Sequence, residues 1–297
     1  MTADRPAVGI LGAGRVGAVL GAALARSGYP IVAASGRSTE SRERHAALLP
    51  GVPRRRPSQV ARAAELLLLA VPDDALGPLV AHLAESGAFR PGQVVAHTSG
   101  AHGTGILHPA VAKGARPLAL HPAMTFTGTA ADLPRLAAGV SFGVTAPADV
   151  RPLALRLVED LGGVAEWIDE QHRALYHTAL AHGANHLVTL VNEAADRLRE
   201  AGVEHPDRVL GPLLRAALDN ALRLGDAALT GPVSRGDAGT VAKHLDTLAA
   251  GAPQSVPAYL ALARRTADRA IAAGRLPADA AEPLLDVLAR RNRERVG

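Results

Sequence analysis

The chain has 297 residues, of which 48% are hydrophobic and 2% aromatic, and it contains no cysteine. Disulfide frameworks and thiolate chemistry are therefore excluded, and the length suits two domains. The formal net charge of +4 rests on arginine, because Lys113 and Lys243 are the only lysines. The one basic cluster, Arg54-Arg55-Arg56, lacks interleaved aromatic residues, so we interpret it as a surface loop and expect no nucleic-acid partner.

The first residues, 1–6, are polar and lead directly into an apolar run. No apolar stretch of the sequence is long enough to span a bilayer. We therefore expect no signal peptide and no membrane partner, and predict a cytoplasmic protein.

A glycine pattern typical of dinucleotide sites follows the predicted first strand, Val8–Leu11. It reads G-x-G-x-x-G, at Gly12, Gly14 and Gly17, and opens a segment with helical spacing of apolar residues. The first glycine permits the tight turn, the second lets the backbone approach a pyrophosphate, and the third allows close packing of helix on strand. The free N–H groups of the helix N-terminus would bind the anion. The alternative is that these glycines serve only turn and packing.

The second predicted strand, residues 29–34, bears on the choice of cofactor. Sites specific for NAD usually end this strand with a carboxylate that bonds the ribose 2′-OH. Here it ends Ser35-Gly36-Arg37-Ser38, and no carboxylate appears before Glu40. Arg37 can pair with a 2′-phosphate, and the serines can donate hydrogen bonds, so we predict NADP(H). Alternatively, Arg37 is a solvated loop arginine.

The next segments alternate between strand and helix patterns. A helix is expected at 39–49, and another runs to about residue 86 with Asp73 as a possible cap. Further strands are expected at 64–71, 93–96, 117–120, 140–144 and 164–168. This alternation predicts an α/β fold with a doubly wound, mostly parallel sheet.

From about residue 169 the apolar spacing becomes helical throughout. Helices are expected at 170–201, 206–224, 237–250, 256–273 and 278–291. We therefore predict a Rossmann domain at 1–168 and an all-α domain for substrate binding or dimerisation at 169–297.

Polar clusters at predicted strand ends are candidates for chemistry. His97-Thr98-Ser99-Gly100 follows one strand, and His121-Pro122 follows the next. In a Rossmann sheet these ends lie beside the ligand, where a histidine can act as a general acid. Each cluster can instead be structural, as capping residues or as a histidine with a backbone partner.

The predicted helical domain has candidates of its own. Arg235 stands just before a helix that Asp237 can cap, a favourable place to hold a carboxylate, unless the two merely pair with each other. Asn185 is surrounded by small residues that leave room for a ligand. His182 and His186 are one turn apart, but no carboxylate completes a ligand set, so we expect no metal.

Taken together, these motifs resemble a known family. GAGRVG, VPDDAL, HTSG, LHPAMTF and LTGPVSRGDAGTVAKHL resemble the bacterial Rossmann-like proteins with a helical C-terminal domain of formerly unknown function. That family is similar to pyrroline-5-carboxylate reductase, ketopantoate reductase and the β-hydroxyacid dehydrogenases. The resemblance implies reduction of a small 2-oxo acid, namely 2-dehydropantoate to pantoate in pantothenate synthesis, by a homodimer.

One position departs from the better-known reductases of this kind. They carry a lysine about one turn before an asparagine, whereas here Ala181 precedes Asn185. The proton donor would then be His121, His97, Lys243 or His244. Two alternatives stay open: a reductase of imines of the pyrroline-5-carboxylate type, and a non-catalytic NADP-binding sensor or partner protein.

The prediction thus names two sets of site residues. Those expected in catalysis are His121, Asn185, Ser99, Arg235 and Lys243. Those expected to bind NADP(H) are Gly12, Gly14, Arg15, Val16, Gly17, Ser35, Arg37, Ser38, Val71, Pro72, Asp73, His97 and Thr98.

Overall fold

The computed structural model describes the backbone of residues 5–296 and divides the chain into two compact units, residues 1–184 and 185–297. This division lies downstream of the predicted domain boundary at 168/169. The reason is local, because Glu170 and Arg173 are hydrogen-bonded to loops of the first unit. The segment that opens the helical region is therefore held by the sheet.

Among the described residues of the first unit, seven strands form one sheet in the order β2-β1-β3-β4-β5-β6-β7. The strands are β1 (Val8–Leu11), β2 (Ile31–Ser35), β3 (Leu66–Leu69), β4 (Val94–His97), β5 (Arg116–Pro122), β6 (Ser141–Thr145) and β7 (Val164–Trp167). From β2 to β5 all pairs are parallel, whereas β6 runs antiparallel to β5 and parallel to β7. The predicted α/β fold with a mostly parallel sheet is confirmed.

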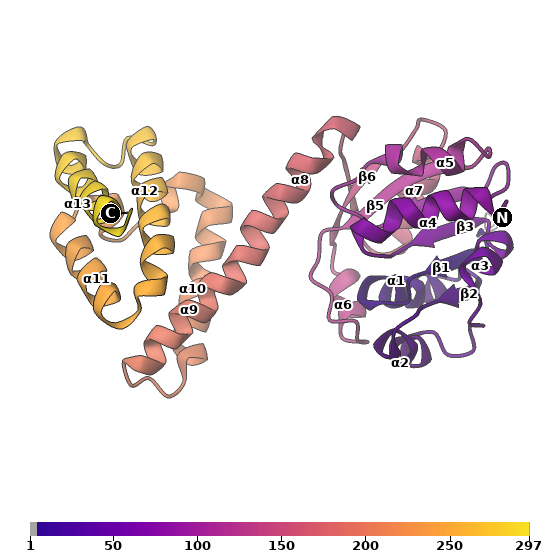
Figure 1. The fold of residues 1–297 in the computed structure, drawn as a ribbon, viewed down its shortest axis with the longest axis horizontal. Helices are drawn as coiled ribbons and strands as arrows, with labels where there is room; N and C mark the ends of the chain where they lie inside the picture. The colour runs from indigo at the N-terminus through magenta and orange to yellow at the C-terminus, as the bar shows by residue number, and fades with distance from the viewer. Residues whose placement is uncertain (1–4, 297) are drawn as a thin grey trace. The chain divides into compact units, whose positions relative to one another are not determined.

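Helices cover both faces of this sheet (Figure 1). One face packs against α1 (Arg15–Arg26), α6 (Asp132–Leu136) and α7 (Arg151–Asp160). The other packs against α3 (Pro57–Ala63), α4 (Asp73–Glu85) and α5 (His108–Val111). Successive residues of a strand serve opposite faces, so that Ile10 joins the first core and Leu11 the second. The wholly apolar strands are explained by this double cover.

Two local predictions in the first unit need correction. Residues 57–63 form helix α3, where no helix was expected; Pro57 suits its first position, and Arg56 N donates to Gln59 Oε1 at 3.2 Å. Asp73 does not cap α4 but is its first residue, because Pro72 occupies the capping position. The carboxylate of Asp73 still lies in the first turn, where the helix dipole favours it.

The expected long helix over 170–201 is not a single α-helix. A 3₁₀ turn (Glu170–His172) leads into α8 (Arg173–Leu180), then a π-helical turn (Ala181–Asn185) precedes α9 (His186–Glu200). Gly202 ends α9 as predicted and has a φ of +86°. Such wide turns often mark functional positions in helices, and this one holds Asn185.

The second unit is entirely helical in the described residues. After α9 come α10 (Pro206–Leu224), α11 (Ala238–Gly251), α12 (Val256–Ala272) and α13 (Ala278–Val296). The buried core comes from the last three of these helices. Within residues 5–296, no helix combines the length and the apolar character needed to cross a membrane.

Candidate active site

The carboxyl ends of β1 and β3 flank the topological switch point of the sheet. The chain leaves β1 toward β2 on one side and returns to β3 on the other side of β1. In open α/β sheets, ligands bind in the crevice that this reversal creates. The glycine loop after β1 and residues Val71 and Pro72 after β3 both line a cavity there.

The three glycines of the loop have different surroundings. Gly12 has a φ of +97°, and a Cβ there would collide with the Ala70 carbonyl. A Cβ on Gly17 would collide with the Gly12 carbonyl, so this position is closed by the helix packing on the turn. A Cβ on Gly14 would meet nothing within 4 Å. Of the three, Gly14 alone faces open space, as a backbone that approaches a ligand requires.

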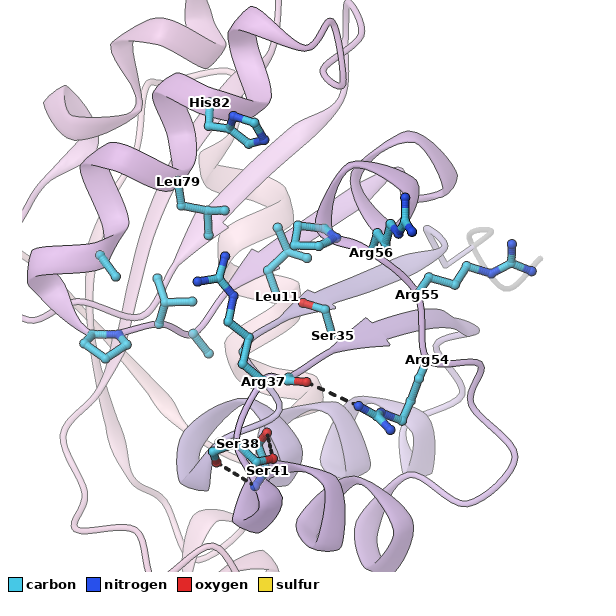
Figure 2. A pocket seen from close by; sticks show the side chains of 18 of the residues that line it. Leu11, Ser35, Arg37, Ser38, Ser41, Arg54, Arg55, Arg56, Leu79 and His82 are labelled. Atoms are coloured by element: carbon cyan, nitrogen blue, oxygen red, sulfur yellow. Dashed lines mark hydrogen bonds between the residues drawn. The ribbon is translucent and has the colours of Figure 1, made fainter.

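The cavity at this edge has a volume of about 1070 Å³ and is rich in arginine. Figure 2 shows Arg37 extending into it, with Arg54, Arg55 and Arg56 along one side. Arg54 Nη2 donates to the Gly36 carbonyl at 3.3 Å, which ties this arginine run to the end of β2. None of the described residues that line the cavity is acidic. The site therefore suits a strongly anionic group.

Sequence reasoning missed the part that Arg54, Arg55 and Arg56 take in this cavity. They lie on an exposed stretch, as expected, but they face the same space as Arg37. The parallel bridge between Ala34 and Arg54 brings them there. The sequence feature that could have predicted this is the basic cluster itself, which follows the second strand by two dozen residues or fewer.

The other predicted cofactor contacts divide into two groups. Ser35 and Ser38 line the cavity, and Ser38 Oγ also caps α2 (Thr39–Leu48) by accepting from Ser41 N at 3.1 Å. The predicted residues outside the cavity lining are Arg15, Val16, Gly17, Asp73, His97 and Thr98. Of these, Val16 packs against the core of the sheet.

His97, at the end of β4, is fully buried. Its Nδ1 accepts from Ser99 N at 3.2 Å, so the other nitrogen, Nε2, donates to the Gly103 carbonyl at 2.8 Å. Burial lowers the pKa of His97 to about 4. Both ring nitrogens thus hold the loop after β4, and the cofactor contact that the sequence suggested stays a prediction.

Ser99 is likewise committed to its loop. It is buried, and its Oγ accepts from His102 N at 3.2 Å. Its carbonyl accepts from Arg173 Nη2 at 2.7 Å. Ser99 thus shapes the loop, and the contact with a substrate oxygen that the sequence suggested stays a prediction.

His121, near the end of β5, is half-buried and has a side-chain partner. Its Nδ1 lies 2.9 Å from the hydroxyl of Tyr176, on α8. Burial, followed by the charge of Arg173, lowers the pKa of His121 to about 4. His121 is therefore neutral at pH 7. Tyr176 and Arg173 were not predicted, because they lie more than fifty residues away in the sequence.

Glu170 and Arg173 fix α8 to the sheet edge. The Glu170 carboxylate accepts from Thr104 N at 2.7 Å and Gly105 N at 2.9 Å. Although burial alone would raise the pKa of Glu170, these hydrogen bonds lower it overall. Arg173 is 1% exposed, and its guanidinium donates hydrogen bonds to three backbone carbonyls.

The remaining predicted catalytic residues belong to the second unit. Asn185 ends the π-helical turn and is exposed, as are Arg235 and Lys243. Asp237 caps α11 as predicted, since its Oδ1 accepts from Thr240 N at 3.0 Å. This backbone hydrogen bond, and then the charges of Arg235 and Lys243, lower the pKa of Asp237. Among the described residues, no three His, Asp or Glu side chains gather to hold a metal ion.

Comparisons with known proteins give fold relatives. The chain is similar to a Bacteroides fragilis protein described as an NADP oxidoreductase, with a TM-score of 0.75, 21% identity, and coverage of 89% of this chain and 98% of that one. It is similar to Plasmodium falciparum pyrroline carboxylate reductase with NADP bound, with a TM-score of 0.58, 13% identity, and coverage of 89% of this chain and 98% of that one. It is also similar to a reductive aminase from Aspergillus terreus in complex with NADPH and ethyl levulinate. There the TM-score is 0.61, the identity is 17%, and the coverage is 98% of this chain and 95% of that one. At these identities the likeness shows the fold alone.

Family models identify both parts of the chain, whereas none of the curated proteins matches it. Residues 1–122 match the Rossmann-like domain. Residues 140–266 match the domain of unknown function DUF2520. The chain thus matches a Rossmann-like domain in its N-terminal part and a DUF2520 domain in its C-terminal part.

Proposed function

We propose that this protein is an NADP(H)-dependent reductase of a small molecule with a C=O or C=N bond. The observation that carries the proposal is the cavity at the switch point, with four arginines and no acidic residue among its described lining. A carboxylate there would bond a ribose 2′-OH and repel a 2′-phosphate, whereas arginines attract the phosphate. The open space over Gly14 leaves room for a pyrophosphate.

The residues present fit this cofactor. Gly12, Gly14 and the start of α1 would hold the pyrophosphate. Arg37 and Ser38 would hold the 2′-phosphate, with Arg54 to Arg56 beside them. When bound, the reduced nicotinamide supplies a hydride. The protein's own task is then to bind the substrate, polarise its double bond and deliver a proton.

The substrate class has two candidates. The sequence resemblance favours a 2-oxo acid, specifically 2-dehydropantoate reduced to pantoate. Arg235 would then hold the carboxylate, and Asn185 would bond the hydroxyl or carbonyl oxygen. The names of the fold relatives, a pyrroline carboxylate reductase and a reductive aminase, favour an imine equally well. A non-catalytic NADP-binding sensor is the third possibility.

The deciding experiment is NADPH oxidation by the purified protein, offered 2-dehydropantoate and pyrroline-5-carboxylate in parallel, with NADH as the second cofactor. Turnover of 2-dehydropantoate with NADPH, and little with NADH, would support the first candidate. Turnover of the imine alone would move the function to the second. NADPH binding without turnover of either compound would indicate the sensor.

We also infer a homodimer, formed through α9 and α10. Eight large apolar side chains on these helices are more than 40% exposed. They are Leu187, Val188, Leu190, Val209, Leu213, Leu218, Leu222 and Leu224. Monomeric proteins rarely expose so much apolar surface in one region. The cytoplasmic location stays a prediction.

The molar mass in solution tests this dimer. Leu222, at 79% exposed, is the most exposed of the eight. We expect Leu222→Glu to convert a dimer into monomers, whereas Leu155→Glu, at an exposed position on α7 in the other unit, should not. A wild-type monomer would remove the proposal.

A further inference from the structure

The Tyr176–His121 contact joins groups from two distant parts of the chain at the carboxyl edge of the sheet. Tyr176 lies on α8, and its hydroxyl is 2.9 Å from His121 Nδ1 on β5. The two rings meet edge to face, with centroids 5.6 Å apart and an interplanar angle of 86°. Gly143, paired with His121 in the sheet, makes room, because a Cβ there would lie 2.6 Å from the hydroxyl.

The chemistry of the two groups indicates which partner carries the proton. A phenol O–H is a much stronger donor than a neutral imidazole N–H, and an unprotonated imidazole nitrogen is the better acceptor. We therefore assign the phenol proton to a hydrogen bond from Tyr176 to His121 Nδ1, which lies 2.9 Å away. A neutral His121 therefore carries its own proton on Nε2. This atom lies beside Gly100, where an added Cβ would be 3.0 Å from Nε2 and 2.6 Å from His177 Cδ2.

A buried cation lies beside this pair. The guanidinium carbon of Arg173 is 5.6 Å from the centre of the Tyr176 ring. Its Nε, Nη1 and Nη2 donate to the carbonyls of His102, Gly143 and Ser99 at 2.9, 3.0 and 2.7 Å. Carbonyl oxygens satisfy the N–H groups but leave the positive charge in place. That charge favours a phenolate on Tyr176 over a phenol.

We propose that Tyr176, His121 and Arg173 form a proton relay that serves the reduction, an inference that rests on the proposed function. When bound, the reduced nicotinamide would supply a hydride to the carbon of the C=O or C=N bond, and the electron pair of the double bond would move to the heteroatom. That heteroatom would take the proton from His121 Nε2, while Nδ1 takes the phenol proton of Tyr176. Arg173 would stabilise the resulting phenolate until Nδ1 returns this proton to it and Nε2 takes a proton from solvent.

A relay is needed because His121 is not an imidazolium at neutral pH. Burial lowers its pKa, and so do the charges of Arg173, His177 and His97, while Asp73 acts in the opposite direction. Burial raises the pKa of Tyr176 most, the charge of Arg173 lowers it and the charge of Glu166 raises it, so that the pKa is raised overall. The imidazole thus gives up one proton only if it receives another.

The first test reads the tautomer of His121 by NMR with isotope-labelled histidine and needs no cofactor. The His121 signals are assigned by their loss in His121→Gln. We expect the wild-type proton on Nε2 at neutral pH. In Tyr176→Phe we expect a mixture of both tautomers, because Nδ1 has lost its donor. A wild-type proton on Nδ1 would overturn the relay, since Nε2 would then have no proton to give.

The second test compares two matched tyrosines. Tyr259 contacts His244 Nδ1 at 2.9 Å in the second unit, with the same edge-to-face arrangement. We expect Tyr176→Phe to lower kcat about a hundredfold, within the range of general acid catalysis, with an unchanged KM for NADPH. Tyr259→Phe should retain kcat. Equal losses, or a loss in Tyr259→Phe alone, would contradict the relay.

The role of Arg173 is tested by phenolate absorbance, which is tractable because the chain has three tyrosines. Arg173→Met should raise the pKa of Tyr176, and Arg173→Lys, which keeps a cation, should restore it in part. An unchanged Tyr176 pKa in both variants would remove Arg173 from the relay. If the wild-type protein reduces no substrate, the proposed function fails, whereas the tautomer and the phenol titration still decide the relay.

Discussion

The carboxyl edge of the sheet holds positive charge in two different ways. At β2, Arg37 and Arg54 to Arg56 are exposed and face an open cavity. At β4 and β5, Arg173 is enclosed, and its N–H groups bond loop and strand carbonyls. Exposed cations without carboxylates are available to a ligand. An enclosed cation holds the surrounding backbone in place and shifts the pKa values of neighbouring side chains. We therefore expect substitutions of the exposed arginines at β2 to alter ligand binding. Substitution of the enclosed Arg173 should alter stability and turnover.

The largest effect is expected from Arg173→Met. Three carbonyls would lose their donor inside the protein, so the first unit should lose about 3 to 5 kcal/mol of unfolding free energy. Arg37→Met, at the exposed end, should change it by about 0.5 kcal/mol or less. Urea unfolding of both variants measures the difference. A loss below about 1 kcal/mol for Arg173→Met would show that the enclosed cation does not organise this edge.

The second effect is a dependence of stability on pH from His97. Its pKa falls from the ordinary 6.5 to about 4 on folding, so between these values the unfolded state binds more protons. The free energy of unfolding therefore falls as the pH drops below 6.5, and this loss levels off near pH 4. Between about pH 7 and about pH 5 we expect a loss of about 2 kcal/mol.

The matching variant is His97→Asn, which should lose the His97 share of this slope and keep the similar share of His121, whose pKa is also lowered to about 4. The comparison concerns the slope with pH and not the absolute stability, because the variant also loses hydrogen bonds to the loop. Equal slopes in both proteins would place the acid sensitivity elsewhere.

The glycine loop allows folding and binding to be separated within one motif. Gly17→Ala places a methyl group against the Gly12 carbonyl and should destabilise the fold by about 1 to 3 kcal/mol. Gly14→Ala meets open space, so we expect normal thermal unfolding but a loss of NADPH affinity, measured by fluorescence titration. If Gly14→Ala binds NADPH as the wild type does, the pyrophosphate does not lie over Gly14.

The smallest effect is a change of cofactor preference at the exposed end. Arg37→Ala should raise the Kd for NADPH about 10- to 100-fold, as expected for one charge-assisted pair, and leave that for NADH unchanged. Arg62→Ala is the control, because Arg62 lies on α3 outside the cavity and donates to the Ser86 carbonyl. Equal losses for both cofactors would show that Arg37 does not read the 2′-phosphate.

The sequence by itself determined the layout of the first unit. The strand at Val8–Leu11 and the glycine spacing after it were predicted, because strand burial and turn chemistry are local properties. The end of β2 likewise singled out Arg37, which lines the cavity at the switch point, from a single short segment. The helices of the second unit followed from apolar spacing, with bounds close to those expected.

Only the tertiary structure decided which side chains meet. His97 and His121 stand at equivalent strand ends in the sequence, yet the first is enclosed by its own loop and the second faces Tyr176. Arg173 enters the edge because α8 folds back onto the sheet, which no local pattern encodes. Contacts across such distances depend on how whole elements pack, and packing is a property of the folded chain rather than of any segment of it.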